Sequence, residues 1–431
     1  MISSNITRNN AGVVCFAGHS VAALAEEYGT PLYLMDEERL RSNCRMYLNA
    51  FATHFGPGSR VLYAAKACSF KEIFRIAAEE GMGLDTVSIG EAYTALAAGF
   101  PAERIYFHGD AKTDKDIRFA LEHGLGCVVA DNPDELALLN AEAKRLGIRQ
   151  KVLLRITPGI DPHTYEAVNT GTVDVKFGVP IETGQAEAFV RAAMAMEHLD
   201  AAGLHCHVGS EVFDEDVFQR TCDVMVDFMA RVHGSLGFTA RELDLGGGYG
   251  VRYVDSDPAA DIPARIGEVA AHLRALVDRA GLPMPYVLME PGRSIVADAG
   301  MTVYTVSTVK RIPRCKNYVI VDGGMADNPR WCLYRARYTV LHGLRQDGET
   351  DVFDLAGRCC ESGDVIQPAV TLPADVCRGD LVCVCTTGAY NYSMASNYNR
   401  LGRPPVVMLS GDGARLAVRR ETPEDLIALD L

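Results

Sequence analysis

The run Val61-Leu62-Tyr63-Ala64-Ala65-Lys66-Ala67 carries a single lysine near the end of an otherwise apolar segment. Pro57-Gly58 precedes the run and an amphipathic stretch follows Ser69, which is typical of a short buried strand. A buried ammonium is costly unless it is paired, so we expect this site to favour a neutral, nucleophilic amine. A lysine that extends its ammonium into solvent from the strand end is the alternative.

The alternation of an apolar run and a helical stretch continues from residue 37 to residue 295. The predicted strands are Val61–Lys66, Gly83–Ser88, Ile105–Gly109, Cys127–Asp131, Val152–Thr157, Gly203–Gly209, Glu242–Gly246 and Tyr286–Glu290. The amphipathic stretches include Phe70–Glu80, Gly90–Ala98, Thr113–Glu122, Asp134–Leu146 and Asp216–His233. Eight such units over about 250 residues predict an α/β fold, a (β/α)8 barrel of the TIM type. A doubly wound open sheet is the alternative.

The pattern changes after Gly300, where short β-type runs are separated by Gly/Pro turns and helical periodicity nearly disappears. These runs are Thr302–Lys310, Tyr318–Val321, Asp351–Ala356 and Leu381–Thr386. We therefore predict two domains, a barrel over residues 37–295 and an all-β domain built from residues 1–36 and 296–431.

Composition indicates a soluble globular protein, with 48% hydrophobic and 23% charged residues among 431. No apolar run reaches the ~18 residues that span a bilayer, and the N-terminus lacks the pattern of a signal peptide. A net charge of -14 without a Lys/Arg-rich block argues against a nucleic-acid partner. The 13 cysteines lack the paired CxxC motifs of a structural zinc site, so we expect reduced thiols in a cytoplasmic protein.

Barrel enzymes carry their active sites at the carboxyl ends of the strands. Five of the predicted strands end in residues of a functional type, which we expect to converge on one face. These residues are Lys66, Asp85, His207-Val208-Gly209-Ser210, Gly246-Gly247-Gly248-Tyr249-Gly250 and Glu290-Pro291-Gly292-Arg293.

The run Gly246-Gly247-Gly248 leaves backbone N–H groups unobstructed, which suits a phosphate at a place where barrels commonly bind one. It is not a dinucleotide fingerprint, because Val251 stands where the third glycine is needed. A tight turn into a helix is the alternative.

His205-Cys206-His207 has two imidazoles on one face, but no convincing partner completes a metal site, so we expect no metal.

Glu290 follows the apolar residues Val287-Leu288-Met289 and therefore needs a buried partner, for which a protonated ring nitrogen is suitable. The flat imidazole of His207 is suited to cover an aromatic cofactor. With a nucleophilic Lys66 and a phosphate-binding glycine run, these residues indicate a site for pyridoxal 5'-phosphate (PLP).

The motifs resemble those of the fold-type III PLP-dependent decarboxylases, the group IV decarboxylases with an alanine racemase-like architecture. The residues that carry the likeness are Tyr63-Ala64-Ala65-Lys66, His207-Val208-Gly209-Ser210, Gly246-Gly247-Gly248 and Glu290-Pro291-Gly292-Arg293. Others resemble the branch that acts on diaminopimelate: Asp322-Gly323-Gly324-Met325, Asn328-Pro329-Arg330, Cys360-Glu361-Ser362-Gly363-Asp364 and Gly388-Ala389-Tyr390-Asn391-Tyr392. The likeness covers essentially the whole chain, including His163, Thr164 and Lys176-Phe177-Gly178 in a long loop from Pro158 to Pro180.

The resemblance implies that Lys66 binds PLP covalently, that His207 covers the ring and that Glu290 pairs with the ring nitrogen. The further cofactor contacts would be Asp85, Ser210, Gly246, Gly247, Gly248, Gly292, Arg293 and Tyr390, and the substrate contacts Arg293, Arg330, Tyr334, Glu361 and Tyr390. Cys360 would donate a proton and would reach the site from the other subunit of a homodimer. Cys359 beside it leaves some ambiguity over which thiol acts, although the spacing to Glu361 favours Cys360.

The implied reaction is decarboxylation of meso-2,6-diaminopimelate at its D-centre to L-lysine and CO2, the last step of lysine biosynthesis. Arg293 and Arg330 suit the retained carboxylate, and Glu361 suits the distal ammonium. Glu211 and Trp331-Cys332 differ from the usual residues of relatives, which concerns fine specificity. The alternatives are a decarboxylase for ornithine, arginine, a D-amino acid or a carboxylated polyamine, a PLP racemase, and an inactive regulator that keeps the fold.

Overall fold

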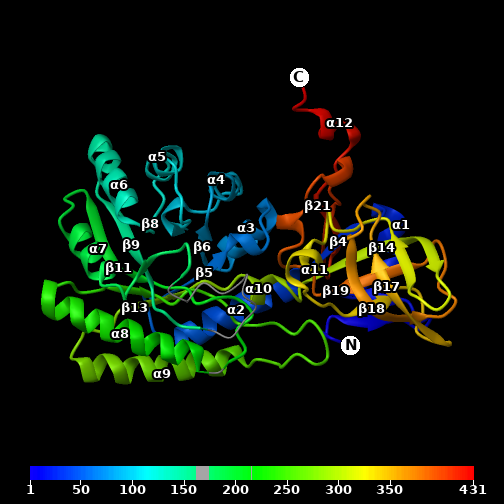
Figure 1. Ribbon diagram of the computed structural model, residues 1–431, viewed down its shortest axis with the longest axis horizontal. Helices are drawn as coiled ribbons and strands as arrows, with labels where there is room; N and C mark the ends of the chain where they lie inside the picture. Colours follow the sequence, from blue (N-terminus) through cyan, green and yellow to red (C-terminus); the bar gives the residue numbers. More distant parts are fainter. Residues whose placement is uncertain (162–173, 215) are drawn as a thin grey trace. The chain divides into compact units, whose positions relative to one another are not determined.

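The computed structural model describes residues 1–161, 174–214 and 216–431 (Figure 1). The chain divides into two units by its internal contacts. The barrel unit contains residues 43–250 and 260–292, and the sheet unit contains residues 1–42, 251–259 and 293–431. The domains predicted from the sequence divide the chain at residues 36/37 and 295/296 instead.

Eight parallel strands of the barrel unit form a closed ring. They are β5 (Arg60–Ala64), β6 (Gly83–Thr86), β7 (Ile105–Phe107), β8 (Cys127–Ala130), β9 (Gln150–Thr157), β11 (Leu199–His205), β12 (Glu242–Asp244) and β13 (Tyr286–Met289). Each strand pairs with the next, and β13 pairs with β5, which closes the sheet. The predicted barrel is therefore confirmed, and the open doubly wound sheet is excluded.

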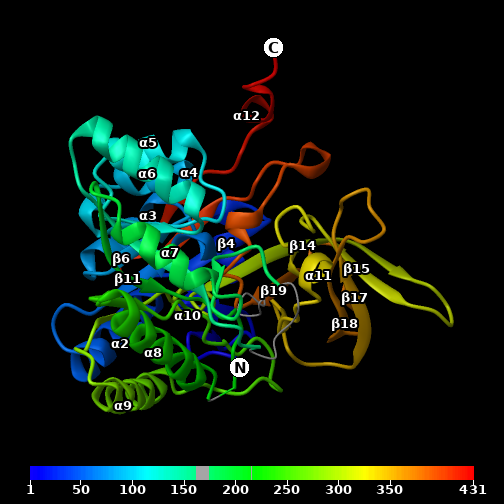
Figure 2. The same ribbon diagram turned by 60° about the vertical axis from the view of Figure 1, so that its left-hand side comes forward.

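Helices of the barrel unit lie outside these strands (Figure 2). They are α2 (Glu37–His54, whose first turns belong to the sheet unit), α3 (Lys71–Glu79), α4 (Ile89–Ala97), α5 (Asp114–Glu122), α6 (Pro133–Leu146), α7 (Gln185–Met194), α8 (Val217–Leu236) and α9 (Ile262–Ala280). Local sequence fixes where they begin: Asn132 caps α6 by accepting the N–H of Glu135, with Pro133 in the first turn. A short strand, β10 (Val179–Pro180), pairs with β9. No helix in the described ranges is long and apolar enough to span a bilayer.

The barrel interior is filled by side chains and is not a pore. Its buried cluster consists of Leu62, Tyr106, Cys127, Val129, Leu153, Ala202 and Leu288. Towards the amino ends of β9 and β12, Lys151 Nζ lies 2.5 Å from Glu242 Oε1 and donates to the Tyr106 hydroxyl at 2.9 Å. This packing leaves the carboxyl ends of the strands as the place for functional side chains.

The sheet unit is built mainly from β-strands, as predicted. Its large sheet has the order β18-β17-β15-β14-β4-β20-β21, with β19 pairing with β14 and β16. The strands are β4 (Leu32–Asp36), β14 (Gly300–Arg311), β15 (Asn317–Val321), β16 (Val340–His342), β17 (Thr350–Ala356), β18 (Val365–Pro373), β19 (Leu381–Cys385), β20 (Val406–Ser410) and β21 (Gly413–Val418). A small sheet contains β1 (Ile6–Arg8), β2 (Val14–Phe16) and β3 (His19–Ser20). Its short helices are α1 (Val21–Tyr28), α10 (Arg293–Val296), α11 (Arg330–Tyr334) and α12 (Pro423–Ile427).

A buried ion pair joins the loop before α5 to the first turn of α6. Lys112 Nζ lies 2.7 Å from Glu135 Oε1, and the two side chains are only 2% and 3% exposed. The same ammonium donates to the carbonyl oxygens of Gly109 and Val129, each at 2.7 Å. Burial lowers the pKa of Lys112 and raises that of Glu135, so each charge depends on the other.

We expect Lys112→Ala to destabilise the chain by about 3 to 5 kcal/mol, because it leaves the Glu135 carboxylate buried without a partner. The midpoint of urea unfolding measures the loss. Lys115→Ala, at an exposed position of the neighbouring helix, is the control and should change little. The double change Lys112→Met with Glu135→Leu should recover most of the stability; an equal loss in the double variant would contradict the ion-pair explanation.

Candidate active site

The sequence-predicted residues of the barrel unit gather at the carboxyl ends of its strands. Lys66 lies in the short turn η1 (Ala65–Ala67) directly after β5, rather than in the strand itself. Its side chain is exposed, whereas Ala65 and Ala67 are buried. Burial raises the pKa of Asp85, and the positive charge of Lys66 works against that rise. Burial also lowers the pKa of His207, and the charge of Lys66 lowers it further. The amine of Lys66 is therefore close enough to Asp85 and His207 to belong to the same candidate site.

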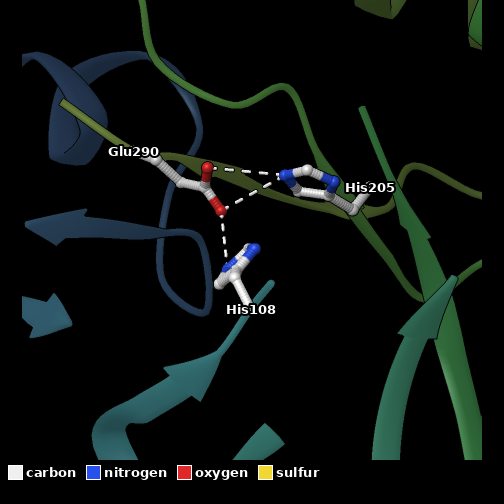
Figure 3. Close-up of side chains that lie close together, drawn as sticks. All are labelled: His108, His205 and Glu290. Atoms are coloured by element: carbon white, nitrogen blue, oxygen red, sulfur yellow. Dashed lines mark hydrogen bonds and ion pairs between the residues drawn. The ribbon is translucent and has the colours of Figure 1, made fainter. Parts of the chain in front are cut away.

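Glu290 lies directly after β13 and is 6% exposed. His108 Nε2 lies 2.9 Å from its Oε1, at ion-pair distance, and His205 Nε2 lies 3.4 Å from both of its oxygens (Figure 3). Burial alone would raise the pKa of Glu290, but the two histidines hold it well below its usual range. The carboxylate is therefore ionised at neutral pH.

A second buried carboxyl group, Asp244 at the end of β12, interacts with Glu290. Burial first, and then the charge of Glu290, raise the pKa of Asp244 well above its ordinary value. Its Oδ1 accepts the N–H of Gly246 at 2.9 Å. Asp244 therefore contacts the glycine run through Oδ1, and its neutral form is more favoured than that of a solvent-exposed aspartate.

His207 is held against the glycine run. Its Nδ1 accepts the N–H of Gly247 at 3.3 Å, and a Cβ on Gly246 would lie only 2.6 Å from that nitrogen. Burial first, and then the charge of Lys66, lower the pKa of His207 well below its usual range. A neutral imidazole fixed in this way is suited to cover a flat ring, and that role of His207 stays a prediction.

The glycine run forms a close backbone-to-backbone packing with neighbouring loops. Gly248 has φ 130°, and a Cβ there would meet the carbonyl oxygen of Gly209 at 2.3 Å. The amides of Gly246 and Gly247 already have acceptors within the protein. The predicted phosphate contact from this run therefore falls on Gly248, whose N–H donates to no acceptor in the described part of the chain.

These residues fit PLP on the evidence of their unused acceptors. In the described part of the chain, Oε1 of Glu290 and Oδ1 of Asp85 are buried and accept no well-aligned hydrogen bond, although His108 Nε2 lies 2.9 Å from the first and 3.7 Å from the second. Buried acceptors are normally satisfied, so this carboxylate pair has capacity for a protonated ring nitrogen. A Cβ on Gly292 would lie 3.0 Å from the Cβ atoms of Ala64 and Ala67, so the loop after Glu290 packs closely beside β5 and η1.

In the sheet unit, two arginines lie among three tyrosines. Arg293 Nη1 donates to the Tyr253 hydroxyl at 2.8 Å, and its guanidinium lies 4.8 Å from the centre of the Tyr390 ring. Arg330 is 2% exposed, lies 4.9 Å from the centre of the Tyr253 ring and donates to the Tyr338 hydroxyl at 2.9 Å. Aromatic faces and hydroxyls thus hold both guanidinium groups in fixed positions for anions.

The loop with Cys360 distinguishes the two neighbouring thiols. Cys359 is 8% exposed, and burial followed by the charge of Asp364 raises its pKa to about 12. Cys360 is exposed, with its N–H bound to Asn399 Oδ1 at 2.6 Å. Asp364 accepts the N–H groups of Cys359 at 2.7 Å and Met325 at 2.6 Å, which ties the predicted motifs together.

The remaining predicted residues occupy varied surroundings. Ser210 is half-buried and precedes Glu211, which has a left-handed φ of 59°. Tyr334 ends α11 and is half-buried, and Glu361 is exposed. The carboxylate of Glu361 accepts the N–H of Gly363 at 3.2 Å.

The described end of the long loop packs on the barrel. The Phe177 ring lies 4.4 Å below the Arg155 guanidinium, and Gly178 donates to Asp131 Oδ2 at 3.0 Å. The predictions for His163 and Thr164 lie outside the described residues.

Sequence reasoning missed His108, Asp244, Tyr253 and Tyr338. A signal existed for the first two, because both are polar residues in the last three positions of a predicted strand, the region that supplied the other candidate residues. His205 was considered only as a metal ligand with His207. The tyrosines lie outside regular strands, so no spacing in the sequence indicates their neighbours.

Comparisons with known proteins identify the family of the chain. Residues 38–297 match the family described as "Pyridoxal-dependent decarboxylase, pyridoxal binding domain". The chain is 43% identical over 425 residues to the diaminopimelate decarboxylase of Bacillus subtilis, covering 98% of this chain and 96% of that protein. It is 42% identical over 439 residues to that of Mycobacterium tuberculosis H37Rv, covering 99% and 97%. The crystal structure of diaminopimelate decarboxylase from M. jannaschii in complex with L-lysine has a TM-score of 0.92 at 33% identity, covering 100% of this chain and 98% of that one.

The closed barrel, the β-rich second unit and the family match define a fold-type III PLP-dependent decarboxylase. Within this class, the chain belongs to the diaminopimelate decarboxylase family.

We expect Gly248→Ala to weaken PLP binding about 10- to 100-fold, because the new Cβ would displace the carbonyl of Gly209 and strain a left-handed backbone. Titration of the purified protein with PLP, followed by cofactor absorbance, gives the affinity. Gly234→Ala in α8 is the matched control, since nothing lies within 4 Å of its added Cβ. Unchanged affinity in the Gly248 variant would contradict a role for this loop in cofactor binding.

Proposed function

We propose that the chain decarboxylates meso-2,6-diaminopimelate at its D-centre, giving L-lysine and CO2 in the last step of lysine biosynthesis. The observation that carries this proposal is the ionised, buried Glu290 at the same barrel edge as Lys66, with acceptor capacity for a protonated ring nitrogen. The identity and coverage of relatives named for this activity support it throughout the chain.

When bound, PLP withdraws electrons from the α-carbon of the substrate, which allows the bond to the carboxylate to break. The amine of Lys66 would hold the cofactor between turnovers and yield its place to the substrate amine. His207 would cover one face of the ring in its neutral form. Glu290 would keep the proton on the ring nitrogen, and Asp85 would stand beside it.

Phosphate binding would fall to Ser210, Gly248, Gly292 and Arg293, with Tyr390 beside the last. The substrate would be recognised at its distal end, where it carries both a carboxylate and an ammonium. Arg293, Arg330, Tyr334 and Tyr390 would bind the carboxylate end, and Glu361 the ammonium. An ornithine-like substrate lacks that carboxylate, so a buried Arg330 favours the diaminopimelate reaction over its nearest alternative.

We propose that Cys360 gives the proton that replaces CO2, and that it comes with Glu361 from the second subunit of a homodimer. The exposure of Cys360 supports this choice, because the buried Cys359 thiol holds its proton too tightly to give it up readily. A cytoplasmic location is also part of the proposal. It is supported by the 13 cysteines, which form no disulfide bond, as expected in a reducing compartment.

Product analysis with stereochemically defined diaminopimelate isomers tests the reaction. We expect L-lysine from the meso isomer and little release of CO2 from the L,L isomer or from ornithine. Lys66→Ala should lower turnover more than about 1000-fold and remove the absorbance of covalently held cofactor. Lys71→Ala, in the exposed first turn of α3, is the control. Normal turnover by the Lys66 variant, or a preference for ornithine, would refute the proposed reaction.

Cys360→Ala should lower kcat about 100- to 10,000-fold, the usual range for the loss of a general acid. Cys359→Ala is the neighbouring control and should keep most of the activity. Steady-state CO2 release, compared with product analysis in deuterated water, measures both the rate and the protonation step. A larger effect from the Cys359 variant would transfer the role to that thiol.

A further inference from the structure

Two buried imidazoles flank the carboxylate of Glu290 in the barrel unit. His108 follows β7 and His205 ends β11, and they are 3% and 1% exposed. Their rings are 5.0 Å apart at 68°, edge to face. Figure 3 shows both rings turned towards the same carboxyl group, which comes from a third strand.

Each ring presents its Nε2 to the carboxylate. The distance to Glu290 Oε1 is 2.9 Å from His108 and 3.4 Å from His205. Burial lowers the pKa of His205 to about 4, so this ring is neutral at pH 7 and carries one proton. An ionised carboxylate can only accept, so the proton of His205 belongs on Nε2. Its Nδ1 has no hydrogen-bond partner in the described part of the chain, which agrees with this tautomer.

Other titratable groups surround Glu290, and two of them are acids that oppose its ionisation. Asp85 from β6 and Asp244 from β12 are buried acids, and the charge of Glu290 raises the pKa of both. His207, after β11, has its Nδ1 occupied by the amide of Gly247. Arg155 from β9 and Lys66 from η1 act on the surrounding groups through their charges. Among the described neighbours, His108 and His205 are the groups that meet the Glu290 carboxylate with a ring nitrogen.

We propose that His108 and His205 are positioning residues that keep Glu290 ionised and aimed, so that the ring nitrogen of the bound cofactor stays protonated. The inference rests on the proposed function and deepens it, because it assigns the control of the ring charge to two residues outside the predicted site. His205 makes a hydrogen bond to Glu290, and His108 lies at ion-pair distance from it. A hydrogen bond to a charged acceptor is strong enough to shift such an equilibrium about 10- to 100-fold. Without them, the proton between the ring nitrogen and Glu290 would move towards the carboxylate.

The test reads the ring nitrogen directly. The enzyme is reconstituted with PLP labelled with nitrogen-15 in the ring, and its nitrogen chemical shift is followed between about pH 6 and 9. In the wild type we expect a protonated nitrogen throughout. In His108→Phe and His205→Phe, which keep a ring but remove the donor, the nitrogen should lose its proton at a pH lower by about one unit or more. Turnover should fall about tenfold in parallel.

Rescue separates the proposed role from simple packing. His108→Gln and His205→Gln restore an N–H donor near the position of Nε2, so they should recover most of the wild-type titration. His342→Phe changes a buried histidine of the sheet unit, 3.1 Å from Asp380, and should leave the titration unchanged. Thermal unfolding of the apoproteins shows whether the Phe variants fold; if they do not, the Gln variants and the wild type carry the comparison.

The outcomes distinguish this inference from the proposed function. If the wild type fails to bind PLP or to release CO2 from diaminopimelate, the proposed function fails. If the wild type does both and the Phe variants titrate as the wild type does, only the inference about the histidines is overturned. It is also overturned if the Gln variants behave like the Phe variants, or if the holoenzyme holds stoichiometric zinc that both Phe variants lose, since the three side chains lie close enough to bind an ion.

Discussion

A buried carboxylate that stays ionised is the constraint on which the barrel site depends. Glu290 lies where burial favours its neutral form, and His108 and His205 reverse that preference. Such a reversal needs donors held within a few tenths of an ångström, because charge-assisted hydrogen bonds weaken quickly with distance and angle. Each of the three side chains comes from a different strand, so the rigidity of the closed sheet is what maintains their spacing.

Closure of the barrel also explains why residues far apart in sequence share one environment. Lys66 and Glu290 are brought together because β13 pairs with β5, the last strand with the first. The interior below them is filled by aliphatic and aromatic side chains and ends in the Lys151–Glu242 ion pair. The strands therefore cannot shift singly, and the ends that carry the functional groups are fixed by the packing beneath them.

Local sequence was enough to predict the eight barrel strands to within a few residues, because apolar runs, caps and turn residues are local signals. It was also enough to find Lys66 and Glu290, whose charge is conspicuous at the end of an apolar run. His108 was not predicted, because its importance depends on contact with Glu290. Glu290 is distant in sequence, and the two side chains meet only in the folded barrel. Tyr253 shows the same limit: it lies in an irregular segment, and only the fold shows that both Arg293 and Arg330 contact it. For Gly246 and Gly247, the sequence suggested amides available to a ligand. In the fold, Asp244 and His207 already accept these two N–H groups.

Asp244 connects the two ends of the cofactor site. If it were ionised beside Glu290, two buried anions would repel each other, and one of them would take a proton. His108 and His205 lower the pKa of Glu290, whereas burial and then the charge of Glu290 raise the pKa of Asp244. Its Oδ1 then remains bound to the amide of Gly246, in the run proposed to bind phosphate. One carboxyl group therefore both accepts the amide of Gly246 and interacts electrostatically with Glu290.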